Sequence, residues 1–404
     1  MDKLTHIVQR TEKRSFWFQV HFVFVVLLLC SLVGSVSTRA NAKVQSLSVS
    51  PHSSTISVPE PSNSAEAACL IDVNSGRILY EKNAHKRMRI ASLTKIITAW
   101  IAVRSGKLDQ MVTASANAVR QEGSSIYLAQ GEKQTLRNLT YAMMLRSGND
   151  SAMAIAEFLG GESSERFAKM MNDQVSKLGL HESHFVNPHG LDHKEHYSTA
   201  HDMAVITATA LRNPLFKQIV STKYYTIPWE AQKWDRKMKN KNKLLWMLKN
   251  ADGVKTGFTK LSGRCLASSS SSDGRQVALI VLRDGNDWVD SEHLLTYGLT
   301  AFERRNVVTS VPIHAIAQVQ YGVQSTVSLK ASGQVDYLFK KSEEPQIETR
   351  VVQVKRLSAP VKAEQVAGRV EYWVKNTKLG QANLITTDAV QPKGLWGRLR
   401  DLFL

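Results

Sequence analysis

The chain has 404 residues, which is too long for one ordinary hydrophobic core and predicts at least two folded units. A hydrophobic content of 43% and a charged content of 22% are ordinary for a globular protein. The formal net charge of +17 is unusual and favours polyanionic surroundings: nucleic acid, anionic lipid or an anionic cell wall. Composition alone does not choose among these partners.

The first 42 residues have the pattern of a secretory signal peptide. An apolar run, FVFVVLLLCSLVGSV, follows a basic stretch, and ANA at 40–42 supplies the small residues that a signal peptidase reads. Because the run is near the lower length limit for spanning a bilayer, an uncleaved anchor is the alternative. Either way the rest of the chain is expected to be exported, which argues against a nucleic-acid partner.

Residues 43–65 are rich in Ser and Pro without periodicity, which predicts a flexible linker. Two short strands follow in AEAACLIDVNSGRILYEKNAH, with a turn at Asn74-Ser75-Gly76. A helical pattern dominates 92–211, strands return as ADGVKTGFT, GRCLASSSSS and RQVALIVLRD, and SEHLLTYGLTAFERR predicts a closing helix. Strands at both ends with helices between them predict an α+β unit with one sheet built from both chain ends.

Past residue 306 the sequence changes to Val-rich alternation, which predicts a small all-β unit, a sandwich, over 307–391. The chain then closes with GLWGRLRDLFL. Its apolar residues gather within one arc of a helical wheel: Leu395, Trp396, Leu399, Leu402 and Phe403. We therefore expect an amphipathic helix over 392–404 lying in a membrane surface, the alternative being a helix docked on the β unit.

The stretch RIASLTKIITAW places Ser92 and Lys95 three positions apart at the start of an apolar helix. Residues at this spacing are neighbours on a helix, and an apolar environment lowers the pKa of a lysine. A neutral amine can take the proton of a hydroxyl, so the pair can form a nucleophile and its base. Alone, this motif is more often a helix cap with a surface lysine.

A second motif, LRSGND, places Ser147 and Asn149 on either side of Gly148. The glycine marks a loop in which both side chains can face one cleft. A hydroxyl and an amide there could relay a proton and hold a peptide carbonyl. The alternative is an ordinary turn between two helices.

A third motif, GVKTGFT, places Lys255 and Gly257 on one face of a strand. The glycine bares the backbone, so that an extended ligand can pair along the strand, and the lysine suits a carboxylate. The backbone N–H groups of Phe258 and Ser92 are expected to form an oxyanion hole.

In the order S-x-x-K, S-x-N, K-T-G, these motifs are the set found in penicillin-recognising serine acyltransferases. The segments ASLTKIITA, MLRSGNDSA, FVNPHGLD, HYSTAHDMA and DGVKTGFT resemble those of the serine D-alanyl-D-alanine carboxypeptidases, the low-molecular-mass penicillin-binding proteins of the peptidase S11 family. The resemblance extends from about Ala65 to the C-terminus. It implies a β-lactamase/transpeptidase-like catalytic domain over 66–306, followed by the β-sandwich domain and the C-terminal amphipathic helix.

The resemblance implies a hydrolase that removes the terminal D-alanine from peptidoglycan stem pentapeptides through an acyl-enzyme. Ser92 is then the nucleophile, Lys95 the proton acceptor, and Ser147, together with Lys255, the proton relay. The expected substrate-binding residues are Asn149, Lys255, Thr256 and Gly257. Expected partners are stem peptides, β-lactam antibiotics as inhibitors and, through the tail, the outer face of the cytoplasmic membrane.

Six histidines lie between His181 and His201, but HGLDHKEH does not match a helical H-E-x-x-H zinc site. No metal or cofactor is therefore expected, and Asp202 is expected to cap or orient a helix. The resemblance further implies that one strand separates Cys69 from Cys265, beyond the reach of a disulfide.

Two other functions remain open from the sequence. A D,D-endopeptidase that cuts peptidoglycan crosslinks would use the same chemistry, and a catalytically idle wall-binding protein would use the basic surface alone. The size of the chain and its β unit disfavour a β-lactamase.

Overall fold

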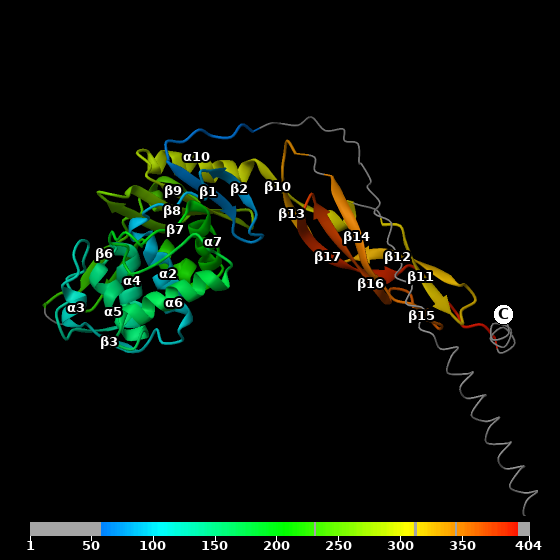
Figure 1. Ribbon diagram of the computed structural model, residues 1–404, viewed down its shortest axis with the longest axis horizontal. Helices are drawn as coiled ribbons and strands as arrows, with labels where there is room; N and C mark the ends of the chain where they lie inside the picture. The colour runs from blue at the N-terminus through cyan, green and yellow to red at the C-terminus, as the bar shows by residue number, and fades with distance from the viewer. Residues whose placement is uncertain (1–57, 230–231, 311–312, 344–345, 395–404) are drawn as a thin grey trace, which may run out of the picture.

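The computed structural model describes residues 58–229, 232–310, 313–343 and 346–394 (Figure 1). The predicted signal peptide, most of the predicted linker and the predicted helical face at 395–404 lie outside the described residues. Within the described ranges, no helix combines the length and apolar character needed to cross a membrane.

The N-terminal α+β domain is built on a five-stranded antiparallel sheet with the strand order β2-β1-β9-β8-β7. Its strands are β1 (Ala67–Asp72), β2 (Ile78–Lys82), β7 (Ala251–Thr259), β8 (Gly263–Ser272) and β9 (Arg275–Leu282). The predicted sheet from both chain ends is thus confirmed. Asp273 and Gly274, with φ of 50° and 72°, form the tight turn between β8 and β9.

Helices cover both faces of this sheet (Figure 1). Alternate residues of β1 are buried toward opposite faces: Ala67, Cys69 and Ile71 join the core shared with most of the helices, and Leu70 joins the core beneath α10 (Asp287–Thr300). The helices on the larger face are α2 (Lys95–Arg104), α4 (Leu136–Arg146), α5 (Asn149–Leu159), α6 (Ser164–Lys177), α7 (Ala200–Leu211) and α8 (Pro214–Ser221).

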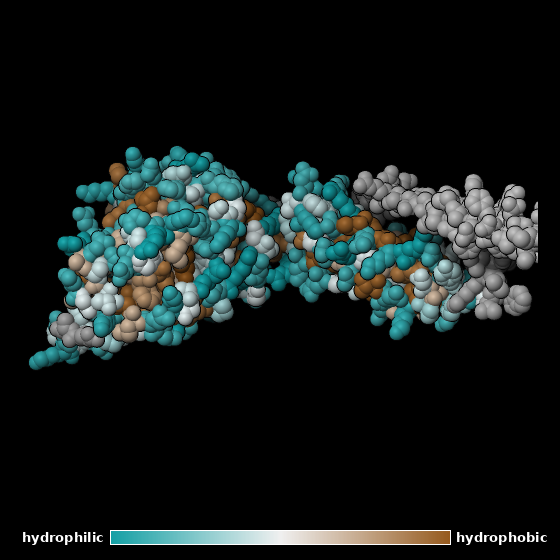
Figure 2. Space-filling view, turned by 60° about the horizontal axis from the view of Figure 1, so that its bottom comes forward, coloured by the Kyte–Doolittle hydropathy of each residue, from teal (hydrophilic) through white to brown (hydrophobic). Residues whose placement is uncertain are grey.

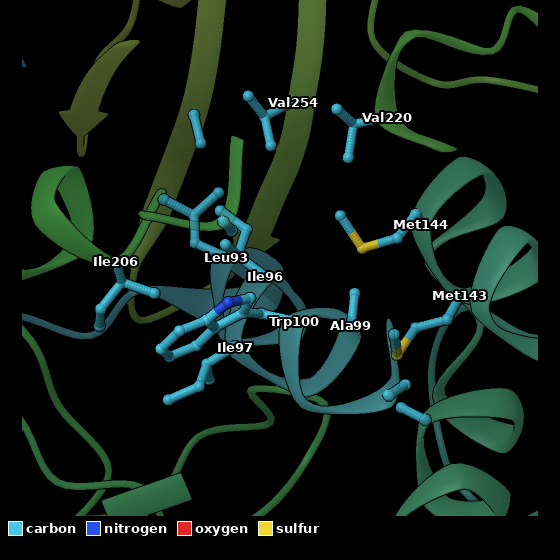
Figure 3. Close-up of a cluster of buried hydrophobic side chains, with 14 of the residues drawn as sticks. Leu93, Ile96, Ile97, Ala99, Trp100, Met143, Met144, Ile206, Val220 and Val254 are labelled. Carbon is cyan, nitrogen blue, oxygen red and sulfur yellow. The ribbon is translucent and has the colours of Figure 1, made fainter. Parts of the chain in front are cut away.

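Shorter elements complete the domain: η1 (Ala91–Thr94), β3 (Met111–Thr113), α3 (Ala116–Val119), β4 (Lys133–Thr135), β5 (Tyr224–Ile227), β6 (Arg236–Lys239) and α9 (Leu244–Met247). The helix α2 lies at the centre of the helical core, packed by Met143 and Met144 of α4, Val220 of α8 and Val254 of β7 (Figure 3). This packing fixes the position of everything at the N-terminal end of α2.

The C-terminal part is an all-β domain with its own core. Its six-stranded sheet has the order β14-β16-β17-β12-β11-β15, and a second, two-stranded sheet pairs β10 with β13. The strands are β10 (Phe302–Asn306), β11 (Ala315–Gln320), β12 (Thr326–Ser332), β13 (Asp336–Lys340), β14 (Ile347–Val354), β15 (Leu357–Ser358), β16 (Val366–Val374) and β17 (Thr377–Thr386), with a helical turn at α11 (Val307–Ser310). The prediction of an α+β domain followed by a β domain is confirmed.

Two predictions from the sequence change in detail. The closing helix, expected to run to 305, ends at Thr300, because FERRN forms β10 and pairs with β13. The expected linker ends before residue 65, because Ser64 Oγ donates to Asp284 at 2.5 Å and the Ser64 N–H donates to Asp290 at 2.6 Å. The last linker residues are therefore part of the folded domain.

The two domains form separate lobes joined by a narrow neck (Figure 2). Arg77, next to the β1–β2 turn, contacts the β domain. Its guanidinium donates to Glu343 at 2.9 Å and stacks over the Tyr337 ring at 4.7 Å from the centroid. Glu60 accepts a hydrogen bond from Lys340 at 2.9 Å. These contacts join the first strands of one domain to β13 and the residues just after it.

Cys69 and Cys265 are buried free thiols on β1 and β8, with β9 between them. The expectation that they form no disulfide is confirmed.

Candidate active site

Ser92 lies in η1, a 3₁₀ turn that precedes α2, rather than in the α-helix itself. In a 3₁₀ turn, side chains three positions apart are nearly eclipsed, which brings Lys95 beneath the serine. Lys95 Nζ lies 3.0 Å from Ser92 Oγ. The Ser92 side chain is partly open to solvent, whereas Lys95 is completely buried.

The turn that carries Ser92 is held by close backbone packing. Ala91 has a φ of 47°, a conformation that non-glycine residues rarely adopt. The Ala91 carbonyl accepts a hydrogen bond from Thr94 Oγ1, and a Cβ added to Gly190 would lie only 1.9 Å from that oxygen. A Cβ added to Gly257 would lie 3.2 Å from the Ser92 nitrogen. Two glycines thus allow a loop and the strand β7 to approach the serine.

Lys95 has two further partners besides Ser92. Its Nζ donates to Asn149 Oδ1 and to the His189 carbonyl, each at 2.7 Å. Burial lowers the pKa of Lys95 well below its usual range, and the charges of Lys255 and Lys241 lower it further, against the opposing effect of Asp150. The site therefore favours an uncharged amine beside a hydroxyl.

The loop between α4 and α5 carries the next two predicted residues. Ser147 ends α4 with a φ of 66°, and Asn149 begins α5 immediately after Gly148. The Asn149 amide nitrogen donates to the Glu122 carbonyl, and this bond fixes which side of the amide faces Lys95. The left-handed residue at Ser147 turns both side chains toward the same space, as the S-G-N motif predicted.

Asp150, which the sequence analysis did not single out, anchors the neighbouring loop. Its buried carboxylate accepts hydrogen bonds from the N–H groups of Ile126 and Leu128, at 3.0 and 3.2 Å, and from Ser125 Oγ at 2.6 Å. The segment 122–128 is therefore held against α5. Its position directly after Asn149 in LRSGND was the only sequence signal.

Lys255 is also completely buried, and its Nζ donates to Ser147 Oγ at 3.1 Å and to the Thr256 carbonyl at 2.6 Å. Burial, with a smaller contribution from the charge of Lys241, lowers the pKa of Lys255 to about 7. Both protonation states are accessible near neutral pH. Lys255 and Ser147 are thus a second amine–hydroxyl pair beside the first.

Lys241 is a second residue that sequence reasoning missed. It follows β6, its Nζ donates to Ser124 Oγ at 3.0 Å, and burial and Arg146 lower its pKa. Its charge acts on both Lys95 and Lys255. Because Lys241 and Lys255 place positive charge beside the uncharged Lys95, the region attracts anions.

The strand β7 forms the edge of the sheet beside η1. Thr256 is half-buried, Gly257 faces the Ser92 turn, and the Phe258 side chain is 66% exposed. An edge strand presents unpaired backbone groups to which an extended peptide can add. The structure thus brings the residues of all three predicted motifs to one place.

The histidines nearest the site are structural. Burial lowers the pKa values of His189 and His196 to about 3, so both are neutral. The Val186 N–H donates to His196 Nδ1, which leaves the Nε2–H to donate to Thr94 Oγ1 at 2.8 Å. Thr98 Oγ1 donates to the Pro188 carbonyl at 2.7 Å. This segment packs along α2 and supports the turn that holds Ser92.

Asp202 orients the start of α7, as predicted. It lies in the first turn of that helix, and its carboxylate accepts from Ser183 Oγ at 2.7 Å and from the Glu182 N–H at 3.3 Å.

The chain is similar to known proteins over both domains. The family described as D-alanyl-D-alanine carboxypeptidase matches residues 54–286, and the family described as penicillin-binding protein 5, C-terminal domain, matches residues 302–392. The chain therefore belongs to the D-alanyl-D-alanine carboxypeptidase family.

Relatives of similar length support this assignment. The D-alanyl-D-alanine carboxypeptidase DacA of Haemophilus influenzae is 31% identical over 89% of this chain and 93% of its own, and DacC of Escherichia coli is 30% identical over 86% and 89%. The crystal structure of penicillin-binding protein 5 from Haemophilus influenzae covers 83% of this chain and 100% of its own, with a TM-score of 0.65 and 30% identity. The DD-transpeptidase of Streptomyces K15, at 31% identity and a TM-score of 0.57, covers 60% of this chain and 99% of its own.

Proposed function

We propose that this chain is a serine-type D-alanyl-D-alanine carboxypeptidase that removes the terminal D-alanine from peptidoglycan stem pentapeptides through an acyl-enzyme. The proposal rests chiefly on the 3.0 Å contact between Ser92 Oγ and a buried Lys95 amine whose pKa is strongly lowered. Membership of the carboxypeptidase family supports the same activity.

Acylation begins with the neutral form of Lys95. A neutral amine has two N–H donors and one lone pair. Because Asn149 Oδ1 and the His189 carbonyl can only accept, they take the two N–H bonds, and the lone pair is left for the Ser92 hydroxyl proton. Ser92 Oγ then attacks the carbonyl between the two D-alanines while Lys95 takes its proton. The resulting oxyanion would accept from the Ser92 and Phe258 backbone N–H groups, whose chain segments lie in contact.

Collapse of the tetrahedral intermediate breaks the C–N bond and needs a proton on the departing amine. Ser147 Oγ can deliver that proton and be reprotonated by Lys255, 3.1 Å away. A pKa of about 7 suits Lys255 to this exchange. D-Alanine leaves, and water hydrolyses the Ser92 ester: the proton held by Lys95 returns to Ser92 Oγ, and the proton lost by the water restores Lys255 through Ser147, which regenerates the enzyme.

Substrate binding uses the edge of β7 and the positive charge beside it. An extended stem peptide would pair along the strand at Gly257, with Asn149 and Thr256 as further polar contacts. Lys255 and Lys241 supply positive charge for the terminal carboxylate, which a carboxypeptidase substrate carries at the residue to be released.

We also propose, from the sequence alone, that the protein is exported and works at the outer face of the cytoplasmic membrane. The leader at 1–42, the net charge of +17 and the apolar arc of 392–404 support this location. Truncation after residue 391 should release the protein from membranes in cell fractionation, and continued sedimentation with membranes would reject a role for the tail.

Fluorescent penicillin tests the nucleophile directly. The wild-type protein should become covalently labelled, and Ser92→Ala should not. Absence of label on the wild type would remove the acyltransferase mechanism, and label on Ser92→Ala would place the nucleophile elsewhere. D-Alanine release from a pentapeptide then identifies the carboxypeptidase, whereas cleavage of crosslinked dimers alone would identify a D,D-endopeptidase.

A further inference from the structure

Two histidines and a glutamate meet at the edge of the sheet opposite the candidate active site. Glu81 lies at the end of β2, His85 follows in the next loop, and His201 lies in the first turn of α7. One ligand atom from each of the three residues lies within 4.8 Å of the others. The strand β2 is one outer strand of the sheet and β7 is the other, so four inter-strand spacings, roughly 19 Å, separate this cluster from the strand that carries Lys255.

Each imidazole already has a carboxylate on one nitrogen. His85 Nδ1 lies 2.6 Å from Glu182 Oε2, and His201 Nδ1 lies 3.3 Å from Asp202 Oδ1. Since an ionised carboxylate only accepts, each Nδ1 carries the proton, and in the neutral ring the Nε2 lone pair is free. This carboxylate–histidine arrangement is the one that orients imidazoles toward a metal ion in known metal sites.

The cluster is also held in place by the backbone. The His201 N–H donates to the Ala84 carbonyl at 2.9 Å, and Met88 and Ser198 exchange two backbone hydrogen bonds. The two imidazole rings stack with centroids 4.5 Å apart. The segment that carries His85 is therefore fixed to the start of α7, although 116 positions separate the histidines.

Electrostatics at the cluster favour a cation. Three carboxylates, those of Glu81, Glu182 and Asp202, surround the two imidazoles, in a chain whose overall charge is strongly positive. His85 Nε2 lies 3.9 Å from Glu81 Oε1, which is too long for a hydrogen bond. A divalent ion between His85 Nε2 and Glu81 Oε1 would replace that long contact with two coordination bonds, one to each atom.

We propose that Glu81, His85 and His201 bind one divalent transition-metal ion, with Zn²⁺ as the best match to two imidazole nitrogens and one carboxylate. A tetrahedral ion with bonds of about 2.0–2.1 Å needs ligand atoms about 3.4 Å apart, so the side chains must close in slightly. The Glu81 and His85 side chains are half-exposed and free to make this adjustment. Water completes the coordination. The ion clamps β2 to α7 and takes no part in peptide hydrolysis.

Calorimetric titration of the full chain with Zn²⁺, on protein freed of metal by a chelator and carrying no histidine tag, tests the site. We expect one equivalent to bind, and Zn²⁺ to raise the melting temperature because the ion binds the folded state. His85→Ala and His201→Ala should abolish both effects. His293→Ala, which removes an exposed histidine on α10, is the matched control and should bind as the wild type does.

Three further measurements keep the test decisive. Glu182→Gln, which leaves the three ligands intact, should weaken Zn²⁺ binding about 10- to 100-fold by releasing His85 Nδ1. Circular dichroism verifies that each variant folds. If a histidine variant does not fold, Glu81→Gln, which removes the third proposed ligand, takes its place in the test. Co²⁺ in place of Zn²⁺ should give the visible absorption bands of a tetrahedral ion. No saturable binding to the wild type, or equal binding to the wild type and the ligand variants, would overturn the proposal.

Discussion

Lys95 Nζ and Asn149 Oδ1 lie 2.7 Å apart in a buried site, although 54 positions separate the two residues in the chain. This contact joins the first two sequence motifs into one unit. A neutral amide can hold the amine in place without favouring its protonation, which a carboxylate at the same position would do. The choice of asparagine at 149 therefore bears directly on whether Lys95 can act as a base.

Asn149→Asp should convert Lys95 into an ammonium near neutral pH. An opposite charge at this distance raises the pKa of a lysine, so we expect acylation by penicillin to slow on the order of 10- to 1000-fold at pH 7. The rate should recover as the pH rises and the amine loses its proton. Stopped-flow measurement of acylation across pH gives the profile, and Asn74→Asp in the exposed β1–β2 turn is the control. Superimposable profiles for Asn149→Asp and the wild type would contradict the proposed role of Lys95.

The pKa of about 7 at Lys255 predicts a pH effect that depends on the substrate carboxylate. The ammonium is present below that pKa and lost above it. For a peptide with a free C-terminal carboxylate, kcat/KM should therefore fall as pH rises through about 7. For a matched peptide amide the fall should be smaller, since Lys255 then acts only as the proton source for Ser147 and no anion has to be bound. Steady-state kinetics on the two peptides provides the comparison, and parallel profiles would argue against carboxylate binding by Lys255.

Lys255 should lower the stability of the fold. Its proton is held up to about pH 10.5 in the unfolded chain but only to about 7 in the folded one, so the unfolded state binds more protons between these values. Stability should therefore rise with pH across this window. Lys255→Met should be more stable than the wild type at pH 7, and its stability should rise less with pH. For a domain of this size, each kcal/mol of added stability raises the Tm by about 2–4 °C. Lys255→Arg, whose charge cannot be lost, should be less stable. Thermal unfolding at pH 7 and 9 tests all three proteins.

Gly190→Ala should displace the turn that carries Ser92. The new Cβ would lie 1.9 Å from the Ala91 carbonyl oxygen, so the loop or the turn must move. We expect reduced penicillin labelling and a lower Tm. Gly106→Ala is a matched control, because Gly106 also has a positive φ, of 70°, but a Cβ there meets nothing within 4 Å. It should cost only the backbone strain, about 1–2 kcal/mol, and leave labelling unchanged. Equal effects of the two substitutions would show that the close approach is unimportant.

The sheet and most helices could be predicted from the sequence because their signals are local. The tight turn at Asp273-Gly274 and the alternation around it determine β8 and β9 without further information. The strand β10 could not be found in this way. Its sequence, FERRN, continues a helical pattern, and it becomes a strand because β13, some 30 positions later, offers a partner.

The candidate site likewise has residues that the sequence predicts and residues that it does not. Ser92, Lys95 and the two later motifs were identified by their order along the chain, and the structure brings these segments together. Lys241 lies in KNKNKL, which has the character of an exposed basic run; the residue is exposed, and its contact with Ser124, 117 positions away, follows from tertiary packing alone. The meeting of His85 with His201 is equally non-local, since the local sequence around neither residue resembles a metal site.

The contacts of Arg77 with Glu343 and Tyr337 have a consequence for how far the enzyme can reach. They fasten the α+β domain to the end of the β domain that carries β10 and β13, while β11 and β15 lie at the opposite end (Figure 1). The bridge between Gly322 and Pro392 returns the chain to that distant end. Because Pro392 lies at that end, we expect the β domain to act as a spacer that holds Ser92 away from any surface bound there.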